Sequence, residues 1–176
     1  MVRFERQPPG TAVTRTTLIL GVVLVAWAGW LVVARQPGPA ALTAGVAATL
    51  LLVGGHRANH GAGGPTDRML DSLADRAWDG VVLATIAWTA EAVKPQVAAG
   101  ALVALGASYL SAYVRARGAS LGYAVEESHV TRGIHYGLIV AGLGFGWLGW
   151  TVWAAAALSL LAVTVRTGQV AREERG

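Results

Sequence analysis

The chain alternates between long apolar runs and short polar segments, and this pattern predicts membrane-spanning helices. A helix needs ~20 mostly apolar residues to cross a bilayer. Six runs approach that length, at about 16–34, 40–55, 69–93, 96–114, 132–146 and 150–165. We therefore predict an all-α integral membrane protein of six transmembrane helices in one domain, with an N-terminal segment at 1–15 and a tail at 166–176.

The overall composition supports a membrane protein. Charged residues make up 14% of the chain, against ~25% in typical soluble domains, and the mean hydropathy is +0.49. The absence of cysteine excludes disulfides and cysteine-based metal sites. Although the sequence pI is about 10.1, the arginines lie between apolar runs and form no basic stripe beside aromatic residues. This distribution argues against a nucleic-acid partner.

The positive residues also predict an orientation. If the N-terminus is cytoplasmic and there are six spans, only Arg35 and Lys94 of the 14 Lys and Arg residues fall outside. Cytoplasmic segments of membrane proteins carry the excess of Lys and Arg. We therefore expect a multi-pass protein of the cell (inner or plasma) membrane, with both termini in the cytoplasm.

One acidic stretch stands at the cytoplasmic end of the third predicted span. It holds every Asp of the chain, four positions apart: Asp67, Asp71, Asp75 and Asp79. Four residues of α-helix advance the side chain by a net ~40° and rise ~6 Å, so Asp71 and Asp75 share a face. Carboxylates in a span cost ~2.5–3.5 kcal/mol each. Arg68 and Arg76 or a hard cation such as Mg²⁺ would compensate them, unless the stretch is the solvated start of a helix.

The segment LDSLADRAWDG, residues 70–80, resembles the second half of the signature of the CDP-alcohol phosphatidyltransferases. That signature reads D-x2-D-G-x2-A-R, eight residues, then G-x3-D-x3-D. The YxRAR form within residues 108–122 looks most like the branch that makes phosphatidylinositol phosphate, and the resemblance covers roughly residues 40–145. In this family, four Asp carboxylates from two helices bind two divalent cations. These cations hold the diphosphate of a CDP-linked lipid.

The resemblance implies roles for the acids. Asp71 and Asp75 would be metal ligands, Asp75 would also be the catalytic base, and Asp67 adds a third carboxylate on the same helix. The cofactor would be Mg²⁺ or Mn²⁺. The partners would be a CDP-linked lipid or a phosphorylated head group, membrane lipids and a second copy of the chain in a homodimer.

The first half of the signature is missing. Counting back from Asp75 places Leu50 and Val53 at the first two motif acids. The same register places Gly54 at the motif glycine and Arg57 in a reversed Ala-Arg pair, which makes both candidate substrate-binding residues. Because Leu and Val supply no oxygen ligand, we expect at most one intact metal site and impaired or lost catalysis.

No shift of register restores the missing acids, because no Asp or Glu stands between Arg6 and Asp67. His56 and His60 stand four apart near this place. They are either part of a remodelled metal site, which would suit a transition metal, or part of a polar, glycine-rich turn.

Three arginines after the fourth predicted span match the family's acceptor and phosphate pocket. Arg115 and Arg117 form the RAR element, and Arg132 matches the second Arg of an ERxxR-like element in which His129 replaces the first. Guanidinium groups suit phosphate, but arginines at a cytoplasmic face also anchor helices to anionic lipid heads.

Three functions therefore stay open from the sequence. The chain is an active phosphatidyltransferase with a remodelled metal site, a non-catalytic relative that pairs with an active paralogue, or a protein that uses His56 and His60 for different chemistry.

Overall fold

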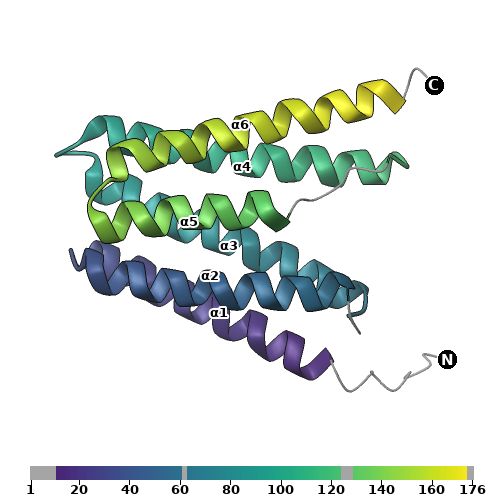
Figure 1. Ribbon diagram of the computed structural model, residues 1–176, viewed down its shortest axis with the longest axis horizontal. Coiled ribbons are helices and arrows are strands. Elements are labelled where there is room, and N and C mark those ends of the chain that lie inside the picture. The colour runs from purple at the N-terminus through teal and green to yellow at the C-terminus, as the bar shows by residue number, and fades with distance from the viewer. Residues whose placement is uncertain (1–10, 61–62, 124–128, 174–176) are drawn as a thin grey trace.

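The computed structural model describes residues 11–60, 63–123 and 129–173, and this part of the chain is helical throughout apart from short turns. Its helices are α1 (Thr11–Val33), α2 (Pro37–His60), α3 (Pro65–Ala90), α4 (Pro95–Ser120), α5 (His129–Phe145) and α6 (Leu148–Glu173). They run back and forth, so the start of α1 and the end of α6 lie at the same end of the bundle (Figure 1). The expected all-α architecture is confirmed.

Proline fixes where three of these helices begin. Pro37, Pro65 and Pro95 each occupy the first position of a helix. A proline there loses no hydrogen bond, because the first N–H groups of a helix have no partner within it. Pro37 and Pro95 each follow a short turn that reverses the chain.

Four helices of the described chain are long and apolar enough to cross a membrane: α1, α2, α4 and α6. The other two differ for separate reasons. α3 carries the four aspartates, and α5 has 17 residues. The structure therefore supports a membrane protein with at least these four candidate spans.

The packing leaves α3 and α5 apart. α3 lies against α1, α2 and α4, whereas α5 lies against α2 and α6. In the described part of the chain, no Cα of α3 approaches a Cα of α5 within 8 Å. The interval between them is filled by long side chains, among them Trp78 and Tyr136, which are almost fully buried. Elsewhere small residues such as Ala44, Ala101 and Ala104 fill the core, which lets helices approach closely.

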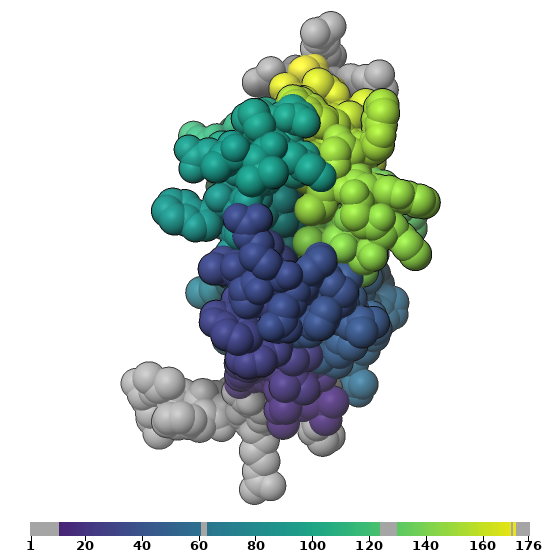
Figure 2. Space-filling model, turned by 90° about the vertical axis from the view of Figure 1, so that its left-hand side faces the viewer, coloured from purple at the N-terminus to yellow at the C-terminus, as the bar shows by residue number. Residues whose placement is uncertain are grey.

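The end of the bundle formed by the α1–α2, α3–α4 and α5–α6 turns faces the viewer in Figure 2. Large exposed aromatic residues stand in or beside these turns, including Trp30, Trp88, Trp147 and Trp150. Aromatic rings of this kind are enriched at membrane–water interfaces. The charged cluster described next belongs to the opposite half of the bundle, because it begins at the N-terminal end of α3.

Candidate functional site

All four aspartates of α3 are buried, with exposed fractions between 0% and 3%. The drift of ~40° per step turns them progressively round the helix. Asp67 meets α1, Asp71 meets α2 and α5, and Asp79 meets α4 and α5. The acids therefore form a spiral whose members have different partners, and each of them has at least one.

Asp67 ties α1 to α3. Its Oδ1 lies 2.6 Å from Nε of Arg15, and its Oδ2 accepts a hydrogen bond of 2.8 Å from the backbone N–H of Gly64. An acid in the first turn also interacts well with the helix dipole. The structure places this carboxylate on the α1 side of α3.

Arg132 lies between the next two acids. From α5 its Nη1 donates to Oδ1 of Asp71 at 3.0 Å, and its Nε lies 3.1 Å from Oδ1 of Asp75. Oδ2 of Asp71 accepts a hydrogen bond of 3.0 Å from Asn59 of α2. The Arg132 residue is itself only 7% exposed. One buried guanidinium thus bridges two buried carboxylates across the interval between α3 and α5.

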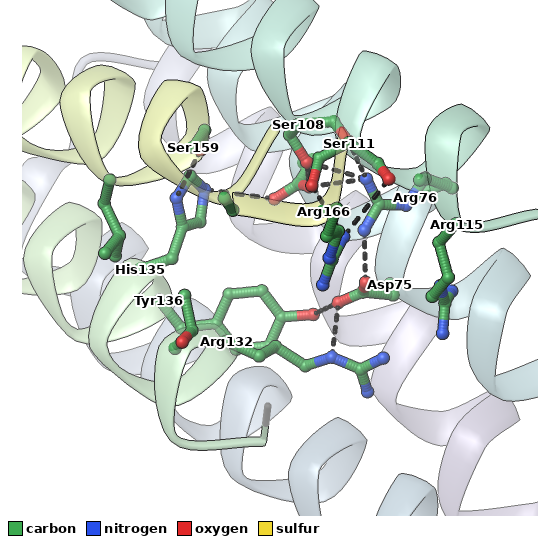
Figure 3. Close-up of a pocket in the computed structure, with 15 residues that line it drawn as sticks. Asp75, Arg76, Ser108, Ser111, Arg115, Arg132, His135, Tyr136, Ser159 and Arg166 are labelled. Atoms are coloured by element: carbon green, nitrogen blue, oxygen red, sulfur yellow. Dashed lines mark hydrogen bonds and ion pairs between the residues drawn. The ribbon is translucent and has the colours of Figure 1, made fainter. Parts of the chain in front are cut away.

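Asp75 has two further partners. The hydroxyl of Tyr136 donates to its Oδ1, and Nη2 of Arg76 donates to its Oδ2. Figure 3 shows Tyr136 and Arg132 reaching from α5 toward this carboxylate, with Arg76 on its other side. The Tyr136 ring packs on Trp78 at 4.2 Å between ring centroids, which fixes the direction of its hydroxyl.

Asp79 links α3 to α4 and α5. Ser108 donates to its Oδ2, Nη1 of Arg76 lies 3.4 Å from the same oxygen, and Nε2 of His135 lies 3.2 Å from its Oδ1. His135 is held from the other side by Ser159 of α6 at 3.4 Å. This end of the spiral therefore connects four helices through polar side chains.

A cavity of about 60 Å³ opens between α3, α4, α5 and α6 beside these groups (Figure 3). A water needs roughly 10–15 Å³ of such space, so the cavity has room for several waters. Its charged and hydroxyl-bearing lining residues are Arg76, Arg115, Arg132, Arg166, His135, Asp75, Asp79, Ser108, Ser111, Thr131, Tyr136 and Ser159. The four guanidinium groups outnumber the two carboxylates, and guanidinium and hydroxyl donors suit an anion with several oxygens, such as phosphate.

Two of the lining arginines are positioned by serines. Nη1 of Arg166 donates to the backbone oxygen of Ser111 at 3.2 Å and to its Oγ at 2.6 Å. Nη2 of Arg115 lies 3.4 Å from Oγ of Ser72. These contacts hold Arg166 of α6 against α4 and Arg115 of α4 against α3.

The structure brings together part of the predicted site. Asp75, Arg115 and Arg132 line the cavity, and Asp71 joins them through Arg132. Arg57 and Arg117 are exposed.

Gly54 is buried in the contact between α1 and α2. A Cβ there would lie 2.8 Å from Cδ2 of Leu18. The structure therefore gives this glycine a packing role, because a larger residue would push the two helices apart.

The structure does not place Val53 at the site. Val53 is 47% exposed on the outside of α2, so it does not form a wall of the site. The residues of α2 that face Asp71 are Gly55, where a Cβ would lie 2.4 Å from Oδ1 of Asp71, and Asn59. Residues two apart on a helix point ~200° away from each other, so a shift of two positions reverses the face. The lack of any acid on α2 is a property of the sequence and is unchanged.

The histidine-based metal site finds no support. His56 and His60 stack on each other with ring centroids 4.7 Å apart, and both are exposed. The nearby carboxylate of Asp71 is buried against Asn59 and Arg132. Among residues 11–60, 63–123 and 129–173, no three His, Asp or Glu side chains form a metal-binding group.

The residues present also do not fit a pair of Mg²⁺ or Mn²⁺ ions. Such ions need about six oxygen ligands each, carboxylates among them. Here α3 supplies all of them, α2 presents Gly55 and Asn59, and the oxygens of Asp71 and Asp75 already accept from side chains.

Sequence reasoning missed several members of the site. Those on the later helices are Ser108, Ser111, His135, Tyr136, Ser159 and Arg166. A signal existed, because these polar residues stand at helical spacing inside apolar runs, where polar side chains usually face the bundle interior. On α5, for example, Arg132, His135 and Tyr136 follow the i, i+3, i+4 pattern of one face.

Comparison with known proteins gives a match at the level of structure. A scan against models of protein families finds no match, and a search of curated proteins finds none either. Among solved structures, the chain resembles the phosphatidylinositol phosphate synthase PgsA1 of Mycobacterium tuberculosis with CDP-DAG bound. The TM-score is 0.76 at 19% identity, over 89% of this chain and 85% of that one. The apo form of the same synthase gives a TM-score of 0.72 at 22% identity, over 91% and 95% of the two chains. The chain therefore has the fold of these membrane enzymes over most of its length.

Proposed function

We propose that this chain is a membrane protein of phospholipid metabolism that binds the phosphate-bearing head group of a CDP-linked lipid or of a phosphorylated alcohol. We further propose that it has lost two-metal phosphatidyl transfer. The fold supports the proposed binding of a head group, since the PgsA1 structure that shares this fold has CDP-DAG bound.

The lining of the cavity carries the proposal. Four arginines and several hydroxyl groups converge on one opening between α3, α4, α5 and α6. A head-group phosphate offers oxygens that accept from such donors, and arginine binds phosphate with two parallel hydrogen bonds. We assign Arg115, Arg166 and Arg132 to this site, Arg132 being also engaged with Asp71 and Asp75. Arg57 and Arg117, which are exposed, contribute to lipid head-group contacts at the membrane surface.

The donor set supports the proposed loss of transfer. α2 provides no carboxylate, and Arg132 lies between the two acids that the family resemblance assigns to metal. A base at Asp75 would also have to take a proton, whereas its oxygens accept from Arg76 and Tyr136.

The placement in the membrane is part of the proposal. We assign all six helices as spans, with both termini and the charged cluster toward the cytoplasm. Two observations support it: the positive-inside distribution and the common end shared by the start of α1 and the end of α6. By the family resemblance, we also propose a homodimer.

The test is binding of CDP-diacylglycerol to the purified protein in detergent, with chelator present throughout. We expect saturable binding that weakens at least tenfold in Arg166→Gln, because this arginine lines the cavity without contacting the aspartates. Arg68→Gln, at an exposed position on α3, is the matched control and should bind as the wild type does. Equal affinity in all three proteins would contradict the assignment of the cavity.

A second assay addresses catalysis. With Mn²⁺ and a broad panel of alcohol acceptors, we expect no release of CMP. Release of CMP by the wild type, abolished in Asp75→Asn, would establish instead an active transferase with a remodelled metal site.

A further inference from the structure

Two buried carboxylates one helical turn apart need a compensating positive charge. Asp71 and Asp75 are each 3% exposed, and an isolated buried carboxylate is strongly unfavourable. The charge nearest to both of them comes from α5, where Arg132 contacts one oxygen of each at 3.0 and 3.1 Å.

The guanidinium occupies the space between the acids. α3 and α5 are not in backbone contact in the described chain, so Arg132 has to cross the interval between them to reach both. The wall opposite is closed by α2, where a Cβ on Gly55 would lie 3.0 Å from Nη1 of Arg132 and 2.4 Å from Oδ1 of Asp71. No side chain larger than glycine fits at that point without displacing the ion pair.

The other oxygen of each acid also accepts a hydrogen bond. Asn59 donates to the second oxygen of Asp71, and Arg76 donates to the second oxygen of Asp75. A divalent cation would have to displace these donors and the Arg132 guanidinium, which is permanently charged.

We propose that Arg132 is a built-in cation that takes the place of a divalent metal between Asp71 and Asp75 and holds α5 to α3. The site is therefore assembled and stable without Mg²⁺ or Mn²⁺. Without the guanidinium, two carboxylates one turn apart remain, and hard divalent cations prefer oxygen ligands of this kind. The inference rests on the site described under the proposed function but does not require that a head group bind.

The test uses thermal unfolding of four full-length proteins in the same detergent, with chelator or with millimolar Mn²⁺. They are the wild type, Arg132→Met, the triple variant Arg132→Met/Asp71→Asn/Asp75→Asn, and Arg68→Met as an exposed arginine control on α3. Methionine keeps much of the length of the arginine stem and removes its charge.

We expect the wild type and Arg68→Met to have the same Tm in chelator and in Mn²⁺. Arg132→Met should lose about 6–20 °C in chelator, the consequence of leaving buried charges unpaired in a domain of this size, and should regain part of that loss in Mn²⁺. The triple variant should be more stable than Arg132→Met in chelator and should not respond to Mn²⁺.

Three results would overturn the proposal: a Mn²⁺-dependent rise in the Tm of the wild type, a Tm of Arg132→Met that is insensitive to Mn²⁺, or a triple variant no more stable than Arg132→Met. If Arg132→Met does not fold in chelator, the triple variant decides. A folded triple variant then supports charge compensation, and an unfolded one contradicts it. Head-group binding is not read in any of these measurements, so failure of the proposed function leaves their outcome intact.

Discussion

Gly55 holds the backbone of α2 directly against the Asp71–Arg132 ion pair, and this predicts that Gly55→Ala is destabilising. The added Cβ would lie 2.4 Å from Oδ1 and 2.9 Å from Cγ of Asp71, and 3.0 Å from Nη1 of Arg132. These atoms belong to buried groups that hold each other in place, so the clash cannot be relieved without lengthening the ion pair or moving α2 away from α3.

The magnitude follows from opposing terms. Replacing glycine by alanine inside a helix gains about 1 kcal/mol of helix propensity. Forcing an extra methyl group into a packed site costs about 1–3 kcal/mol, and opening a buried ion pair costs up to about 3–5 kcal/mol. The ion pair has to lengthen but not to break, so only part of the last cost applies, and we expect a net loss of about 1–4 kcal/mol. For a chain of this size, each kcal/mol lowers the Tm by about 2–4 °C.

Gly45→Ala is the matched control on the same helix. A Cβ there would meet only Cγ1 of Val140 at 3.5 Å, an ordinary contact. It should leave the protein unchanged or stabilise it by up to about 1 kcal/mol. The assay is thermal unfolding followed by circular dichroism in one detergent.

A double variant tests the mechanism of the Gly55 effect. If the cost arises from the ion pair, adding Gly55→Ala to Arg132→Met should cost less than Gly55→Ala costs alone, because the same interaction is lost only once. Gly55→Ala as stable as Gly45→Ala would refute the close approach of α2 to the ion pair.

Two further substitutions probe the ends of the network. Asp67→Asn should lower the free energy of unfolding by about 1–2 kcal/mol, since it weakens a charged hydrogen bond to the partly exposed Arg15. In the double variant Asp67→Asn/Arg15→Gln, a loss of unfolding free energy equal to the sum of the two single losses would contradict an interaction between these residues. Tyr136→Phe should cost about 1.5–3 kcal/mol, because Asp75 loses one donor while the packing on Trp78 stays. Unfolding measurements that find Tyr136→Phe neutral would show that this hydroxyl does not support Asp75.

The helices and the acidic spiral were accessible from the sequence, because they depend on local patterns. Apolar runs bounded by prolines predict helices, and the four-residue spacing predicts that the acids turn slowly round α3. Their partners were not accessible in the same way. Arg132 lies 61 positions from Asp71, and only the packing of α5 beside α2 and α6 brings it between the two acids.

The position of Val53 was not accessible from the sequence for a similar reason. Counting a motif across the connection between α2 and α3 assumes one loop length, and a shift of two residues turns the face of the helix. Val53 was expected at the site for this reason, whereas Gly55 lies there. Gly55 itself stands in a glycine-rich segment, where nothing in the sequence distinguishes a close helix contact from a turn.

The most direct test of the account is a calorimetric titration of Mn²⁺ into the purified wild-type protein, with and without CDP-diacylglycerol. If Arg132 replaces the metal, no saturable Mn²⁺ binding will be seen in either condition. Saturable binding that is lost in Asp71→Ala/Asp75→Ala would contradict the account, because it would mean that these two carboxylates still serve as ligands of a divalent cation.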